Sequence, residues 1–128
     1  MDGPLAYTID AERRVAVLTY RAQPTISQWS HTIERILSEA GCVPSLGILL
    51  DRRMIFRPAE TEYIKRMVRI LDERHAAGKV ARCAIVAADQ GSYGMGRMAE
   101  QLTTFEGSIR TFKGFPDAEK WVAGAEDV

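Results

Sequence analysis

The sequence contains little cysteine and histidine and has no excess of charge of either sign. Its 128 residues include two cysteines, two histidines, 17 basic and 17 acidic side chains, so the formal net charge is zero. Nucleic-acid-binding proteins usually carry a basic excess, and we therefore expect no nucleic-acid partner. The two cysteines, Cys42 and Cys83, form neither a C-x-x-C pair nor a metal-binding spacing, which predicts reduced structural thiols and no metal site.

Long apolar runs are absent as well. No stretch approaches the roughly 18 consecutive apolar residues of a membrane-spanning helix. The first residues, Met1 to Pro4, lack the positive and apolar regions of a signal peptide. These absences predict a cytoplasmic protein with no integral membrane segment.

The composition is that of a globular protein. Apolar residues make up 46% of the chain and charged residues 27%, which are ordinary values for a folded domain. The length fits one domain, and no repeat, low-complexity tract or linker interrupts it. We therefore expect residues 1–128 to form a single domain.

Apolar periodicity predicts a hairpin followed by a helix in the first third of the chain. Residues 5–9 and 15–20 alternate or are β-branched like strands, and the short turn between them favours an antiparallel pair. Thr25 and Gln28 form a capping-box pattern that predicts the start of a helix, and Gly41 is placed to end it.

The rest of the chain alternates strands and helices. The apolar run of residues 46–50, which ends at Asp51, is typical of a central strand covered on both faces. The remaining expected elements are a helix from Pro58 to Gly78, a strand over 81–87, a loop over 89–92, a helix over 93–105, a strand over 108–112 and a helix opening at Pro116. The order ββαβαβαβα predicts an α/β fold: a mostly parallel five-stranded sheet flanked by four helices, with an antiparallel edge strand at the N-terminus.

Candidate binding residues follow the carboxyl ends of the predicted strands, where α/β proteins bind ligands. They lie in the loops after the third and fourth strands and at the start of the next helix: Asp51, Arg52, Arg53, Arg57, Asp89, Tyr93, Gly94 and Arg97. The arginines favour an anionic ligand if they converge, and otherwise form a solvated loop. Asp51 could act as a base, a metal ligand or a phosphate acceptor, or it could bond the amides of its own loop or pair with Arg52 or Arg53.

Familiar catalytic and cofactor patterns are missing from these loops. Gly91, Gly94 and Gly96 reverse the G-x-G-x-x-G spacing of dinucleotide sites, and no acidic residue ends the next strand. Ser92 has no histidine near it in the sequence. We therefore predict no cofactor and assign no catalytic residue.

Four segments and the initial hairpin resemble the SpoIIAA-like proteins, relatives of the STAS domain (sulfate transporter and anti-sigma-factor antagonist). The segments are Ile48–Arg53, Ala84–Val86, Tyr93–Met98 and Phe112–Trp121, and the resemblance covers nearly the whole chain. It implies a sheet flanked by helices and an architecture shared with lipid-binding CRAL-TRIO domains. True antagonists carry a phosphorylated serine directly after the aspartate, where this chain has Arg52.

The resemblance implies a non-enzymatic module that docks a protein partner, with an anionic or lipid ligand as a further candidate. A carrier of lipids or apolar small molecules is the alternative, since Met54, Ile55 and Phe56 could form a lid. A degenerate receiver domain and an enzyme using Asp51 with Asp89 are less favoured readings. A homodimer is compatible with the apolar helix faces.

Overall fold

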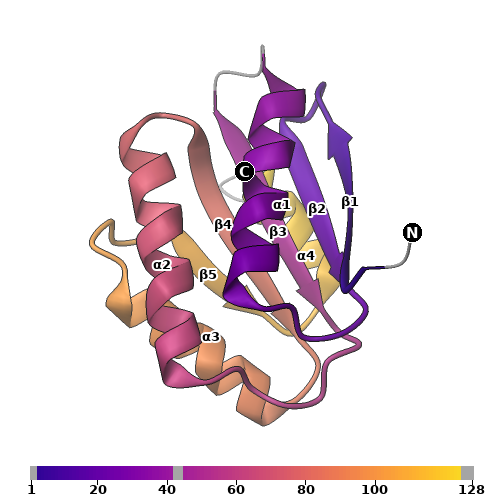
Figure 1. Cartoon of the computed structure of the whole chain (residues 1–128), viewed down its shortest axis with the longest axis vertical. Helices are drawn as coiled ribbons and strands as arrows, with labels where there is room; N and C mark the ends of the chain where they lie inside the picture. The colour runs from indigo at the N-terminus through magenta and orange to yellow at the C-terminus, as the bar shows by residue number, and fades with distance from the viewer. Residues whose placement is uncertain (1–2, 42–44, 125–128) are drawn as a thin grey trace.

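The computed structural model describes residues 3–41 and 45–124, which form one sheet and four helices (Figure 1). The strands are β1 (Leu5–Asp10), β2 (Val15–Tyr20), β3 (Leu46–Arg52), β4 (Val80–Ala87) and β5 (Ile109–Phe112). The helices are α1 (Ile26–Ala40), α2 (Thr61–Ala76), α3 (Gln90–Leu102) and α4 (Phe115–Val122). The element order predicted from the sequence is confirmed. Cys42 lies outside the described residues.

The strands stand in the sheet in the order in which they occur in the chain, from β1 to β5. The β1–β2 hairpin is antiparallel, and β2, β3, β4 and β5 are joined by parallel pairing. The sheet is therefore mixed, with the predicted antiparallel strand at its N-terminal edge.

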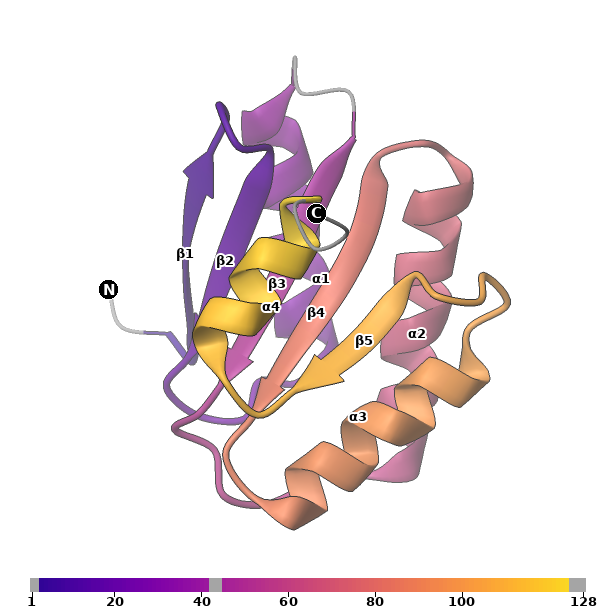
Figure 2. The ribbon, with the colours of Figure 1, turned by 180° about the vertical axis from the view of Figure 1, so that it is seen from behind.

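The helices cover the two faces of the sheet unequally. Helices α1, α2 and α3 pack on one face, and α4 alone crosses the other (Figures 1 and 2). In β3, Ile48 and Leu50 belong to the larger core, while Leu49 packs with Trp121 on the α4 side. Every residue of β3 is buried, because each face of this central strand has a helix above it.

Local sequence signals explain where the helices begin. The capping box at α1 is confirmed: the Gln28 backbone N–H donates to Thr25 Oγ1 at 3.1 Å, and the Thr25 N–H donates to the Gln28 side chain at 2.9 Å. The expected start of α2 at Pro58 is wrong, because Glu60 is the N-cap and the helix begins at Thr61.

Three other boundaries also differ from the prediction. Helix α3 begins at Gln90, because the Asp89 carboxylate accepts the Ser92 N–H at 3.1 Å and caps a turn that was expected to be a loop. The helix ends at Leu102, before the expected end at Phe105. Strand β3 continues through Arg52, which pairs with Ala87 of β4, so Arg52 is a strand residue rather than a loop residue.

The described residues contain no helix that is long and apolar enough to cross a membrane. Residues 3–41 and 45–124 also contain no group of three or more histidine, cysteine or acidic side chains that could hold a metal ion.

Candidate functional site

The loops that follow β3, β4 and β5 meet at the carboxyl edge of the sheet. Pro58 Cδ lies 3.4 Å from the point where a Cβ on Gly91 would stand, and the Ala59 N–H donates to Met95 Sδ at 3.2 Å. On the other side of α3, the Lys113 ammonium lies 5.2 Å from the centre of the Tyr93 ring. The three loops predicted to converge therefore do so.

The two adjacent arginines of this edge nevertheless lie on opposite faces of the sheet. Arg52 lies over the Tyr20 ring, in the core below α1 and α2, with 5.1 Å between guanidinium carbon and ring centre. Arg53 lies 4.7 Å from the centre of the Phe115 ring, on the α4 side. This separation follows from the alternation of side chains along an extended chain.

Arg53 forms a bidentate salt bridge with Asp51. Its Nε and Nη2 atoms each donate to a different oxygen of the Asp51 carboxylate at 2.9 Å, and its backbone N–H donates to Oδ1 at 3.1 Å. Burial alone would raise the pKa of Asp51, but the hydrogen bonds and charge of Arg53 outweigh burial and lower that pKa. Asp51 is thus an ionised carboxylate that closes the end of β3.

Arg57 and Arg97 lie apart from this pair. The Arg57 side chain is exposed, and its carbonyl oxygen accepts a bond from Arg52 Nη2 at 3.2 Å. Arg97 is exposed on α3 and pairs with Glu100 at 3.5 Å. The four candidate arginines therefore do not line one common pocket.

The remaining candidates mainly shape α3. Asp89 caps the helix, so Asp51 and Asp89 each have a separate structural partner. A Cβ on Gly94 would meet nothing within 4 Å, whereas one on Gly96 would stand 2.4 Å from Thr111 Oγ1. Gly96 therefore allows close packing of α3 on β5, and the glycine pattern does not form a phosphate cradle.

A buried polar cluster surrounds Arg52. The Arg52 side chain is only 2% exposed and donates from Nη1 to Gln23 Oε1 at 2.9 Å. Tyr20 and Tyr63 are its neighbours, and the indole N–H of Trp29 stands by the Tyr20 hydroxyl. Neither hydroxyl nor the indole N–H has a hydrogen-bond partner among the described residues. Burial raises the pKa of Tyr63 to about 12, so its hydroxyl stays protonated at neutral pH.

No sequence motif marked this cluster. Its aromatic residues come from three separate elements, with Tyr20 in β2, Trp29 in α1 and Tyr63 in α2. One signal could have revealed the cluster: Tyr20 and Arg52 end adjacent parallel strands, so their side chains reach the same edge of the sheet.

The β3–α2 loop, residues 53–60, displays two large apolar side chains. Met54 is 67% exposed and Phe56 is 69% exposed, whereas Ile55 between them is buried in the core. The Ile55 N–H donates to the Arg52 carbonyl at 3.0 Å, which closes a tight turn. Ile55 thus anchors the loop, while its two neighbours face solvent.

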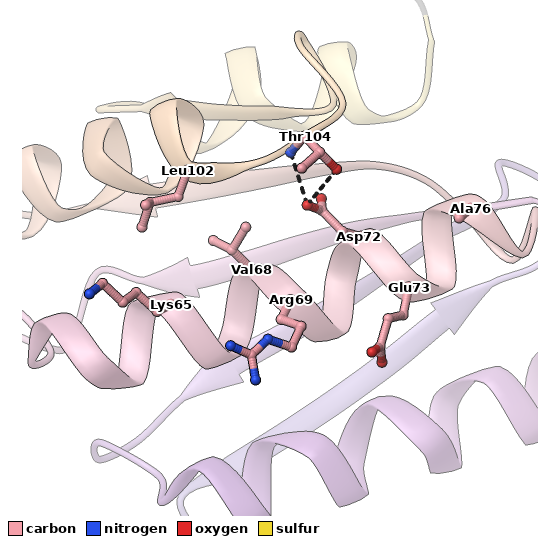
Figure 3. A pocket seen from close by; sticks show the side chains of 8 residues that line it. All are labelled: Lys65, Val68, Arg69, Asp72, Glu73, Ala76, Leu102 and Thr104. Atoms are coloured by element: carbon pink, nitrogen blue, oxygen red, sulfur yellow. Dashed lines mark hydrogen bonds between the residues drawn. The ribbon is translucent and has the colours of Figure 1, made fainter.

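A second surface feature is a groove of about 430 Å³ between α2 and α3 (Figure 3). Val68 of α2 and Leu102 of α3 supply apolar surface on its two sides, and Lys65 and Arg69 extend from α2 along its rim. Asp72 joins α2 to the segment after α3 by accepting the Thr104 N–H at 2.9 Å. No sequence motif marked this groove, because its lining residues come from two separate helices.

Comparison of the chain with protein-family models, with curated proteins and with solved structures found no match.

Proposed function

We propose that the chain is a non-enzymatic binding module that docks a protein partner through its β3–α2 loop. The observation that carries this proposal is the exposure of Met54 (67%) and Phe56 (69%) on a loop whose central residue is buried. Side chains of this size normally enter the core, and exposed apolar clusters mark interaction sites.

The chemistry of the loop favours a protein partner with an apolar pocket and an acidic rim. Methionine, aromatic residues and arginine are enriched at protein–protein interfaces. Arg57 stands beside Phe56 in the chain, and its exposed guanidinium has no partner among the described residues. Because Ile55 anchors the loop, little conformational entropy has to be lost when the partner binds.

Two further observations support a role in binding rather than catalysis. The carboxylates proposed as a catalytic pair, Asp51 and Asp89, are held by Arg53 and by the Ser92 N–H. The resemblance to STAS-like proteins points in the same direction, since the matching loop follows the third strand in both. The proposal therefore includes a STAS-like architecture for this chain.

A photo-crosslinking amino acid placed at position 56 in living cells, with one at position 102 as control, tests the proposal. A protein captured only from position 56 is then purified, and its affinity for the chain is measured by calorimetry. We expect the Met54→Ser/Phe56→Ser double variant to bind at least about tenfold more weakly, because buried anchors at hot spots are worth about 2 kcal/mol each. The Leu102→Ser variant should bind as the unmodified chain does.

Two results would contradict docking through the loop. One is unchanged affinity of the purified partner for the double variant, with circular dichroism showing that the variant is folded. The other is a partner whose binding is lost in Leu102→Ser but kept in Met54→Ser/Phe56→Ser, which would assign docking to the α2–α3 groove.

The groove favours a second candidate function, the carriage of an apolar small molecule. Its volume of about 430 Å³ lies in the range of small-molecule sites, and Val68 and Leu102 offer apolar contact. Native mass spectrometry of protein purified from cells tests this alternative. A bound mass that disappears in Leu102→Asn, a change at a side chain that is 39% exposed, would support a carrier, and a clean unliganded mass would count against it.

A further inference from the structure

Within residues 3–41 and 45–124, Arg52 is a buried cation without a carboxylate partner. Its side chain is 2% exposed, and its two acceptors among the described residues are neutral: Gln23 Oε1 at 2.9 Å from Nη1 and the Arg57 carbonyl at 3.2 Å from Nη2. Its Nε has no hydrogen-bond partner within the described part of the chain. Buried charges are normally paired, because removing them from water is unfavourable by several kcal/mol.

The neighbouring arginine shows what this guanidinium lacks. Arg53 uses the edge formed by Nε and Nη2 to bind both oxygens of Asp51, each at 2.9 Å. The same edge of Arg52 holds one neutral carbonyl oxygen at Nη2 and nothing at Nε. A planar carboxylate matches such an edge with two parallel hydrogen bonds.

Buried hydrogen-bond donors lie near Arg52. The Tyr20 hydroxyl and the Trp29 indole N–H belong to fully buried side chains, and the Tyr63 hydroxyl is buried as well. Burial, reinforced by the neighbouring Tyr63, raises the pKa of Tyr20, while Arg52 and the Trp29 indole act in the opposite direction. Both hydroxyls therefore keep their protons, and the cluster offers hydrogen-bond donors to an anion.

We propose that Arg52, with Tyr20, Trp29 and Tyr63, forms a binding site for a small carboxylate, which the β3–α2 loop closes in this structure. The carboxylate would take the Nε–Nη2 edge of Arg52 in place of the Arg57 carbonyl oxygen. A carboxylate fits better than a phosphate, because it is planar and its single negative charge balances one buried guanidinium.

Entry of the carboxylate requires the part of the β3–α2 loop around Arg57 to move away from Arg52. The loop is linked to Arg52 by the Arg57 carbonyl, which accepts from Nη2, and by the Ile55 N–H, which donates to the Arg52 carbonyl; the Ile55 side chain is buried in the core. Binding would release the Arg57 carbonyl and shift Phe56, which stands between Ile55 and Arg57 in the chain. The carboxylate site does not depend on the proposed docking function, since it can be tested without a partner.

Titration of the isotope-labelled chain with sodium acetate, followed by NMR, tests the site. The reporters are the Arg52 Nε–H and the Trp29 indole N–H, and sodium chloride at matched ionic strength is the reference. We expect saturable shifts of both signals with acetate alone, together with an acetate-dependent rise in melting temperature. Equal and unsaturable responses to acetate and chloride would overturn the proposal.

Variants identify the residues that bind acetate. Tyr63→Phe removes one buried hydroxyl and should weaken acetate binding about tenfold, since a hydrogen bond to a charged group is worth about 1.5 kcal/mol. Arg52→Lys, which lacks the planar edge, should abolish saturation, and Arg110→Lys on β5 should leave it unchanged. If Arg52→Lys fails to fold, an unaltered acetate affinity in Tyr63→Phe is sufficient to refute the site. A stronger response to phosphate than to acetate would refute the carboxylate assignment.

Discussion

Gly96→Ala should give a clearly lower unfolding free energy than Gly94→Ala, although both variants replace a glycine of α3 by alanine. Both glycines lie inside α3, where alanine is favoured over glycine by about 1 kcal/mol. They differ in what a Cβ would meet. At Gly94 there is nothing within 4 Å, whereas at Gly96 the new atom would stand 2.4 Å from Thr111 Oγ1 and 2.5 Å from Thr111 Cγ2.

The magnitude follows from these distances. Non-bonded heavy atoms normally lie about 3.5–4.0 Å apart, so α3 would have to move away from β5 by about 1 Å. Overpacking of this kind destabilises proteins by about 1–3 kcal/mol. Gly94→Ala should therefore stabilise the fold by up to about 1 kcal/mol. The difference in unfolding free energy between the two variants should be about 1–3 kcal/mol, since the gain in helix propensity cancels.

Urea denaturation followed by circular dichroism measures both unfolding free energies. Because the two variants have the same composition, their slopes against urea should agree and their midpoints should differ. The double variant Gly96→Ala/Thr111→Ala removes both clashing atoms and leaves Thr111 Cβ at 3.0 Å, so it should recover part of the loss. Equal stabilisation by Gly94→Ala and Gly96→Ala would refute the close packing of α3 on β5.

Three other predictions concern single interactions. Burial would raise the pKa of Asp51, but Arg53 lowers it, so the Asp51–Arg53 pair stabilises the fold above about pH 4. This stabilisation is lost as the pH falls through the lowered pKa of Asp51. In urea titrations, Arg53→Gln should therefore reduce the unfolding free energy by up to about 1 kcal/mol at pH 7 and by almost nothing at pH 2. Burial raises the pKa of Cys83 to about 12, so in a Cys42→Ser variant this thiol should react with Ellman's reagent at pH 8 only after denaturation. Thr25→Ala removes the α1 cap and should lower the unfolding free energy by about 1 kcal/mol in the same urea assay, with a larger loss than the exposed Ser27→Ala.

The order of the elements can be predicted from the sequence because each signal is local. The capping box of Thr25 and Gln28, the hairpin and the buried apolar run of β3 each depend on neighbours a few residues away. Boundaries are harder to predict when a cap competes with residues that disfavour a helix. Asp89 caps α3 although Gly91 and Gly94 follow, and Glu60 rather than Pro58 precedes α2.

The candidate site could be predicted only in outline. Parallel strands bring their carboxyl ends together, which is why the loops after β3 and β4 meet as expected. The faces on which Arg52 and Arg53 lie depend on where β3 ends. Strand β3 continues one residue beyond Asp51, because Arg52 still pairs with Ala87 of β4. This additional pair places the Arg52 side chain in the core beside Tyr20. No local sequence pattern indicates the residue at which a strand stops pairing with its neighbour.

The strand order of the sheet also bears on how the chain can assemble during synthesis. Each strand pairs with the one that precedes it in the chain, so no strand has to be inserted between two others that are already joined. The β1–β2 hairpin forms the first part of the sheet, and β3, β4 and β5 then add in turn to its open edge. In a nascent chain, the strand with which each new strand pairs has therefore already been synthesised. Helix α4, which covers the second face of the sheet, is synthesised after β5.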